Sequence, residues 1–193
     1  MAIDSDLELM LRVRRGEAEP FEELLRRHRA PLVNYFWRML RDPALAEDLA
    51  QEVFLRIYRA RDRYRAEARF TTWLYRIATN LALNALRNRR GISPPEETGE
   101  SDDASGSPEI ADARPTVEQR LMESDRERMI RAAVEALPEN QRAAVILHKY
   151  QEVNYRQSAK ILGVSESAVK SLLFRAYETL RARLEPLLKG GQR

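Results

Sequence analysis

The stretch "NYRQSAKILGVSESAVKSLLFRAYETL", residues 154–180, decides the fold of the second half of this chain. It divides into a short amphipathic run, a three-residue turn "GVS" and a longer amphipathic run. Gly163 suits the left-handed position that ends a helix, and Ser165 is a good N-cap for the helix that follows. Apolar residues recur at i, i+3, i+4 and i+7 from Val169, which is one face of a helix. The pattern predicts a helix, a tight turn and a second helix.

The opposite face of the second run is polar and almost free of acid. Small hydroxyls lie between cations, and after Glu166 no carboxylate follows until Glu178. A helix that needed only solubility would more often pair Glu with Lys one turn apart. A DNA-binding helix-turn-helix places such a second helix in the major groove, whereas the alternative is a solvated helical hairpin. The candidate base and phosphate contacts on this face are Ser167, Lys170, Ser171 and Arg175.

Composition narrows the class of protein. The chain has 193 residues, of which 44% are hydrophobic and 33% charged, as in a soluble globular protein of one or two small domains. No run of 18 apolar residues occurs, and the N-terminus is too acidic and interrupted for a signal peptide, so we expect a cytoplasmic protein without membrane insertion. The absence of cysteine excludes disulfides, thiolate chemistry and cysteine-based metal sites.

The distribution of charge divides the chain into three parts. Residues 1–90 hold 18 Lys or Arg against 13 Asp or Glu, and residues 116–193 hold 14 against 10. Residues 91–115 between them hold one Arg against seven acids and are rich in Gly, Pro and Ser. Such a segment buries too little surface to fold, so we expect a flexible acidic linker between two domains. Basic blocks of this kind often meet nucleic acid.

Both domains are predicted to be helical, which makes the fold all-α: two small helical domains, the second with the helix-turn-helix. Asp42-Pro43 combines a capping carboxylate with Pro at the first helical position. Pro31 is expected to break or kink the helix that begins near Glu19. Thr116 and Gln119 form a predicted capping box. No alternating strand pattern and no internal repeat is visible in the sequence.

Two stretches of the first domain have patterns that suit a partner. Asp48, Gln51, Glu52 and Leu55 share one helical face, which is either a contact for a basic partner helix or an ordinary exposed stripe. From Arg61 to Arg90 there are eight arginines against two acids, with aromatic residues interleaved. Cations follow phosphates and aromatic rings stack on exposed bases, so this stretch is a candidate for holding single-stranded nucleic acid. A core role is the alternative for its aromatic residues.

Three stretches together resemble the extracytoplasmic-function (ECF) sigma factors of bacterial RNA polymerase, over nearly the whole chain. The stretches are "DPALAEDLAQEVFLRIYRARDRYR" (42–65), "ARFTTWLYRIATNLALNALRNRRG" (68–91) and "LPENQRAAVILHKYQEVNYRQSAKILGVSESAVKSLLFRAYETLRARL" (137–184). They look like the polymerase-clamp helix, the −10 element reader and the −35 element reader of that family. A lone helix-turn-helix would be a weak signal, but the three motifs in this order are specific.

The resemblance implies an alternative transcription initiation factor that binds core RNA polymerase, recognises −35 and −10 promoter elements and promotes promoter melting. It assigns core binding to Asp48, Gln51, Glu52 and Leu55. It assigns −10 DNA binding to Tyr64, Arg65, Phe70, Arg76, Asn80 and Asn84. It assigns −35 DNA binding to Arg156, Ser165, Ser167, Lys170, Ser171 and Arg175. The implied partners are core RNA polymerase, promoter DNA and an anti-sigma factor, with no cofactor and no small-molecule substrate.

Two departures from the family pattern and two rival classes remain. Arg156 and Gln157 follow Tyr155 where the family usually has acids, and Leu172 stands where a second basic residue is common, so the promoter sequence is hard to derive. A stand-alone helix-turn-helix repressor would leave the clamp-like and −10-like helices unexplained. An enzyme would have to use His28 or His148, and neither lies in a metal-spaced cluster or a nucleophile–base motif. We therefore expect no catalytic activity.

Overall fold

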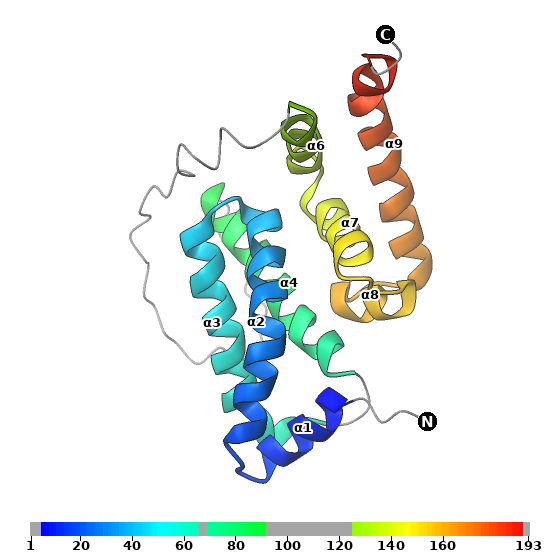
Figure 1. The fold of residues 1–193 in the computed structure, drawn as a ribbon. Coiled ribbons are helices and arrows are strands. Elements are labelled where there is room, and N and C mark those ends of the chain that lie inside the picture. The colour runs from blue at the N-terminus through cyan, green and yellow to red at the C-terminus, as the bar shows by residue number, and fades with distance from the viewer. Residues whose placement is uncertain (1–4, 66–68, 92–124, 191–193) are drawn as a thin grey trace.

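The computed structural model describes residues 5–65, 69–91 and 125–190, and every regular element in these ranges is helical. Eight α-helices and one short 3-10 helix are present there, without a strand (Figure 1). The all-α prediction is therefore confirmed. The predicted linker lies, apart from Gly91, outside the described residues, as does the predicted capping box at Thr116.

The first four helices form an N-terminal lobe. Its elements are α1 (Ser5–Arg14), α2 (Glu19–Leu40), α3 (Pro43–Arg59), the 3-10 helix η1 (Arg61–Arg63) and α4 (Phe70–Arg89). The start of α3 follows the predicted signal, because Asp42 Oδ1 accepts a hydrogen bond from the Leu45 amide at 3.0 Å and Pro43 occupies the first helical position. The sequence thus sets this turn by local chemistry alone.

The α2 helix continues through Pro31, so of the two predicted outcomes, a break or a kink, the break does not occur. A proline inside a helix removes one backbone hydrogen bond and costs roughly 3 kcal/mol. Pro31 itself is exposed, but Leu24, Leu32 and Tyr35 on the same helix are fully buried. Burying one such side chain contributes about 1.5–3 kcal/mol, so the packing of several of them outweighs the local penalty.

The last four helices form a C-terminal lobe, drawn from green to red in Figure 1. They are α6 (Asp125–Glu135), α7 (Glu139–Tyr150), α8 (Tyr155–Leu162) and α9 (Glu166–Gly190). Pro138 lies just before α7, at its N-cap position. Helix α9 has its own small core with α7, in which Val169, Leu173 and Ala176 are buried. The predicted apolar face therefore holds this lobe together.

The two lobes are docked on each other. Helix α8 packs on α4, and α7 packs on α2. Ile146, Leu147 and Ile161 of the C-terminal lobe belong to the same buried cluster as Phe36 and Met39 of the N-terminal lobe. Much of the apolar surface of α7 is thus removed from water by the other lobe, and we call this arrangement the closed state.

Polar contacts cross the same interface. The Tyr75 hydroxyl on α4 donates a hydrogen bond to Gln151, and burial raises the pKa of Tyr75 so that it stays a neutral donor. Ion pairs join Arg41 to Glu135 at 2.8 Å and Arg90 to Glu139 at 3.1 Å. The docking is therefore specific in its polar groups as well as in its apolar packing.

Arg142, near the start of α7, is buried and connects three chain segments. Its Nη1 donates to the carbonyl of Met39 in the N-terminal lobe at 2.8 Å. Its Nη2 donates to the carbonyls of Glu135 and Leu137 within its own lobe. These carbonyls lie at or near the ends of α2 and α6, where helices leave backbone acceptors without intrahelical partners. One guanidinium thus satisfies acceptors in both lobes.

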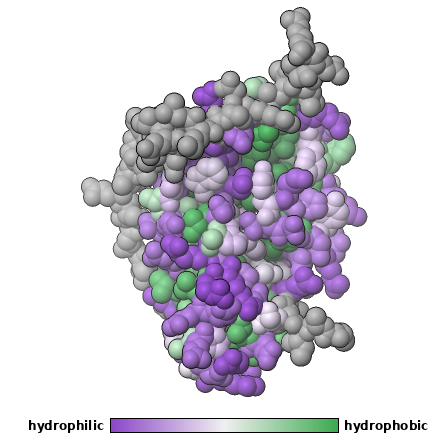
Figure 2. Space-filling model, in the orientation of Figure 1, coloured by the Kyte–Doolittle hydropathy of each residue, from purple (hydrophilic) through white to green (hydrophobic). Residues whose placement is uncertain are grey.

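The surface in the orientation of Figure 1 is mostly hydrophilic, with separate small apolar areas (Figure 2). The largest apolar area in this view lies where α6 and α9 approach each other. None of the helices in the described ranges is both long and apolar enough to cross a bilayer.

Candidate nucleic-acid interface

The helix-turn-helix has the local geometry that its sequence predicts. Asn154 and Gln157 form a reciprocal capping box at the start of α8, with Gln157 N donating to Asn154 Oδ1 at 2.9 Å. Gly163 ends α8 in the left-handed region, at φ 66°. Ser165 Oγ accepts from the Ala168 amide at 3.2 Å and so caps α9. The turn fixes the direction in which α9 leaves the domain.

The predicted −35 contacts lie on the exposed side of the motif. Arg156, Ser165, Ser167, Lys170, Ser171 and Arg175 are all exposed. Ser171 Oγ donates to the carbonyl of Ser167 at 3.1 Å, so its oxygen lone pairs can accept from a donor outside the helix. The Lys170 ammonium lies 5.9 Å from the centre of the Tyr155 ring, which orients it by a cation–π contact. The predicted set therefore forms one polar face.

Phe174 is a residue of this face that the sequence reasoning missed. Its side chain is 68% exposed, although phenylalanine is usually buried. It lies one turn after Lys170 and two turns after Ser167, so helical spacing would have placed it on the polar side. Leu172, by contrast, is only partly exposed and packs against the C-terminal core.

Helix α4 presents a second polar stripe. Arg76, Asn80 and Asn84 are exposed and follow one another at intervals of four residues, so they share a face. Ala78, Leu81 and the other apolar residues of α4 point into the core. The amides can donate hydrogen bonds to bases or phosphates and accept them from bases, whereas the guanidinium can only donate. Arg65, which precedes α4, is also exposed.

Tyr64 and Phe70 are placed differently from the rest of the predicted −10 set. Tyr64 is 4% exposed, with its ring centre 5.2 Å from that of Trp73, and Phe70 is fully buried. His28 packs on Phe70 from α2 at 5.3 Å. In the closed state neither ring offers a face to a base. Their contacts with DNA stay predictions that would require this corner of the N-terminal lobe to rearrange.

The predicted polymerase contact is an exposed face of α3. Asp48, Gln51 and Leu55 are exposed, and Leu55 is 50% exposed. Glu52 is partly buried and forms an ion pair with Arg56 at 2.6 Å. Tyr58, one turn further along, is also exposed and was missed by the sequence reasoning. An apolar pair beside carboxylates is typical of a protein-binding surface.

The two histidines have structural surroundings. His28 Nε2 lies 2.8 Å from Asp6 Oδ2, and the His148 ring stacks on Tyr155 with centres 5.1 Å apart. His148 Nδ1 also lies 3.2 Å from the carbonyl of Val153. Among the described residues, no three His, Asp or Glu side chains are grouped in a way that could hold a metal ion.

A helix-turn-helix with an acid-poor outer face, joined to a lobe with a polar amide stripe, defines a DNA-binding protein. Comparison with known proteins specifies the class further. A family model described as Sigma-70 region 2 matches residues 24–92, and one described as Sigma-70, region 4 matches residues 127–180. These two ranges fall in the N-terminal and C-terminal lobes, respectively.

Relatives from three bacteria match along almost the whole chain. The RNA polymerase sigma-H factor of Pseudomonas aeruginosa is 32% identical over 189 residues, which cover 96% of this chain and 97% of the relative. The RNA polymerase sigma factor CarQ of Myxococcus xanthus is 34% identical over 92% of this chain and 97% of its own length. The ECF RNA polymerase sigma-E factor of Escherichia coli is 30% identical over 96% of this chain and 97% of its own. The chain therefore belongs to the ECF sigma factors of the sigma-70 family.

Solved structures have the same fold. CnrH, in complex with the cytosolic domain of CnrY, superposes with a TM-score of 0.72 at 21% identity, covering 95% of this chain and 99% of that one. The sigma factor RpoE of Bartonella quintana, in complex with the anti-sigma factor NepR, gives 0.63 at 21% identity, covering 87% and 98%. Members of this family are transcription initiation factors that bind core RNA polymerase and promoter DNA, and this chain is an alternative sigma factor.

Proposed function

We propose that the two lobes divide promoter recognition between them. In this proposal residues 1–90 bind the polymerase clamp and the −10 element, residues 91–115 connect the lobes, and residues 116–193 read the −35 element. The exposed, acid-poor face of α9, held rigidly by the caps at Gly163 and Ser165, is the observation that carries it. The polymerase supplies the chemistry, so this chain catalyses no reaction and acts in the cytoplasm.

Individual side chains have distinct roles in this proposal. Ser167, Lys170 and Ser171 near the start of α9 reach base edges, and Arg175 with Arg156 reaches phosphates. Phe174 adds an apolar contact, since a phenyl ring can touch the methyl group of thymine. On α4, Arg76 follows the backbone of the melted strand while Asn80 and Asn84 contact its bases.

The closed state cannot bind both promoter elements at once. Elements named −35 and −10 lie about 25 base pairs apart, and at about 3.4 Å per base pair this is roughly 85 Å. The longest helix of the chain, α9 with 25 residues, extends only about 38 Å at 1.5 Å per residue. Since α8 packs directly on α4, the lobes have to separate before both elements are engaged. We infer that the closed state is a resting state.

A protein that holds the lobes together would restrain the factor, and we propose an anti-sigma factor as such a partner. Support comes from two similar folds, CnrH and the Bartonella RpoE, which were solved in complex with CnrY and with the anti-sigma factor NepR. The exposed apolar residues of α3, Leu55 and Tyr58, offer a surface that core polymerase and such a partner could compete for.

Run-off transcription tests the proposed function. The chain is added to core polymerase on a library of genomic fragments, and discrete transcripts with a shared −35 and −10 sequence are expected. The variant with Asp48→Lys and Glu52→Lys should lose core binding by pull-down while keeping its helicity and Tm. A stable dimer that binds duplex without polymerase and yields no transcript would instead support a stand-alone repressor.

A further inference from the structure

A cavity of about 410 Å³ lies between the lobes, at the end of α2. Trp37, Arg38 and Arg41 line it from the N-terminal lobe, and the rest of its wall comes from α6 and α7. The residues on that second wall are Glu127, Ile130, Arg131, Val134, Ile146 and Tyr150. A cavity of this size falls in the range of small-molecule sites. Because both lobes form it, the cavity exists only in the closed state.

Three guanidinium groups surround one indole in this cavity, and we call them the arginine cage. The guanidinium carbons of Arg38, Arg41 and Arg131 lie 5.9, 4.5 and 5.1 Å from the centre of the Trp37 ring. That of Arg38 also lies 3.7 Å from the centre of the Tyr150 ring. Cation–π contacts hold each arginine in place, but they do not neutralise its charge. Glu135 pairs with Arg41 at 2.8 Å and Glu127 lies beside the cage, so three guanidiniums and two carboxylates leave one net positive charge in a partly desolvated space.

Arg41 is the cation with the least favourable surroundings. Burial lowers its pKa to about 10, Glu135 opposes this effect, and the neighbouring guanidiniums, Arg131 foremost, lower the pKa further. Its Nη1 is buried and has no hydrogen-bond partner within the part of the chain that the structure describes. A buried donor without an acceptor is costly. Because this Nη1 exposes no surface to the cavity, an anion there would reach it only if the guanidinium turned toward the space, and the exposed parts of the cage would make the first contacts.

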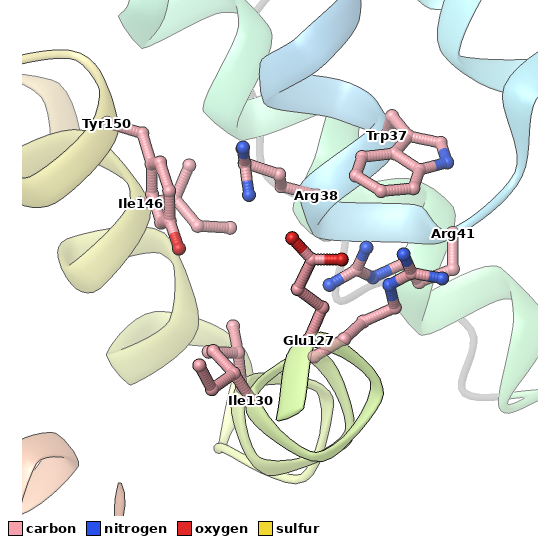
Figure 3. A pocket seen from close by; sticks show the side chains of 9 residues that line it. Trp37, Arg38, Arg41, Glu127, Ile130, Ile146 and Tyr150 are labelled. Carbon is pink, nitrogen blue, oxygen red and sulfur yellow. The ribbon is translucent and has the colours of Figure 1, made fainter. Parts of the chain in front are cut away.

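The cavity already receives one anionic group of the chain itself. The carboxylate of Glu127 points into the space beside Arg38 and Arg41 (Figure 3). Glu127 lies in the first turn of α6 and is exposed, so it can move away without disturbing the core. Its position indicates which chemistry the cage accepts: oxygen atoms that carry negative charge.

We propose that the arginine cage binds a small phosphoryl-bearing anion in place of the Glu127 carboxylate, and that this anion holds the two lobes closed. Planar guanidiniums bind phosphate oxygens in pairs, with charge-assisted hydrogen bonds. A multivalent phosphoryl group carries more charge than the single carboxylate it displaces. A ligand that binds only the closed state shifts the population toward it, and so opposes promoter engagement. The second part of this inference rests on the proposed function.

Calorimetric titration of the full chain with sodium pyrophosphate, at constant ionic strength, tests the binding site. We expect saturable binding of one anion per chain. Arg38→Gln and Arg131→Gln should each weaken it at least tenfold. Arg26→Gln is the matched control, because Arg26 is on α2 as well but has a 74% exposed side chain away from the cavity. Binding that is unsaturable, or that Arg26→Gln weakens equally, would overturn the site.

Glu127→Gln provides a test that misfolding cannot imitate. Removal of the competing carboxylate should tighten pyrophosphate binding severalfold, whereas a damaged fold could only weaken it. An affinity no higher than that of the unmodified chain would contradict the displacement of Glu127. Circular dichroism of all variants checks that their helicity is unchanged.

Distance measurements between spin labels test the effect on the lobes. The chain has no cysteine, so Ala44→Cys on α3 and Arg181→Cys on α9 provide two unique labelling sites. Pyrophosphate should increase the fraction of short distances, and Arg131→Gln should remove this effect. A distance distribution that pyrophosphate does not change would overturn the closing role. RNA polymerase releases pyrophosphate with each nucleotide it adds, so the run-off assay contains inorganic pyrophosphatase to remove it. A failure of the closing test is then distinguishable from a failure of the proposed sigma activity.

Discussion

Helices α9 and α4 both carry candidate DNA contacts, but only on α9 are all of these side chains exposed. On α9 every predicted contact is exposed, and the helix is fixed by a glycine turn and a serine cap. On α4 the polar stripe is exposed, whereas Phe70 at its start and the nearby Tyr64 are buried. A duplex exists before the protein arrives, so a rigid reader suits it. A single strand exists only after promoter melting, so the site that binds it can take its final arrangement at that later stage.

The largest effect should come from breaking the support of α9 alone. Val169→Asp would place a charge in the C-terminal core, where Val169 is fully buried, and should cost about 3 kcal/mol or more. Thermal unfolding should show a destabilised C-terminal lobe. In a separate binding assay, the variant should no longer bind duplex DNA. Binding of a single-stranded −10 oligonucleotide should persist, since Val169 is outside the core of the N-terminal lobe. Loss of both activities would mean that the two readers are not separable.

A smaller effect should distinguish base contacts from phosphate contacts on α9. Lys170→Ala should cost about 1–3 kcal/mol on the cognate −35 duplex and relax discrimination at one position. Arg175→Ala should weaken binding to all sequences alike. It should also reduce the slope of the logarithm of the binding constant against the logarithm of the salt concentration by roughly one. Fluorescence anisotropy on duplexes with single base changes measures both. Lys149→Ala, an exposed cation on α7, is the control. If Lys170→Ala weakened binding to all duplexes equally, Lys170 would contact the DNA phosphate backbone and not a base.

On α4, the effect of a single amide should depend on the stage of initiation. Asn80→Ala should reduce open-complex formation by about 1 kcal/mol, the size of one hydrogen bond, and leave initial promoter binding nearly unchanged. Permanganate footprinting measures the melted fraction, and a gel shift at low temperature measures initial binding. Asn34→Ala, an exposed amide on α2, should change neither. Equal losses at both stages would give Asn80 a structural role.

The smallest effect is expected at Phe174, whose ring should contribute about 1 kcal/mol or less to the free energy of DNA binding. If its ring contacts a thymine methyl group, replacing that thymine by uracil should weaken binding of the unmodified protein. The same replacement should have no effect on Phe174→Ala. A uracil effect that persists in the variant would place Phe174 outside the groove.

Local signals in the sequence predicted most of the secondary structure, and non-local packing accounts for the rest. Asp42-Pro43 and Gly163 act within a few residues of themselves, so they could be found from the sequence. Of the break or kink predicted at Pro31, the break does not occur, because buried neighbours on α2 outweigh the local penalty. The docking of α7 and α8 on the other lobe has no local signature, since their buried residues would look the same in an isolated domain.

The candidate sites show the same division. The polar faces of α3, α4 and α9 could be predicted because helical spacing alone places residues on one side. Burial of Tyr64 and Phe70 could not, because an aromatic residue among arginines suits both stacking on bases and packing in a core. Phe174 was within reach of the sequence, since the spacing that placed Lys170 outward places it outward as well.

The hydrogen bonds of the Arg142 guanidinium show what is lost and what is kept when the two lobes separate. Two of its three carbonyl acceptors belong to its own lobe, and only that of Met39 belongs to the other. Separation of the lobes therefore gives up one hydrogen bond of this group, which water can replace, and leaves intact the two that tie α6 to α7. For this group, opening of the lobes is therefore a different event from unfolding of the C-terminal lobe: the hydrogen bonds that join α6 to α7 do not have to re-form when the lobes dock again.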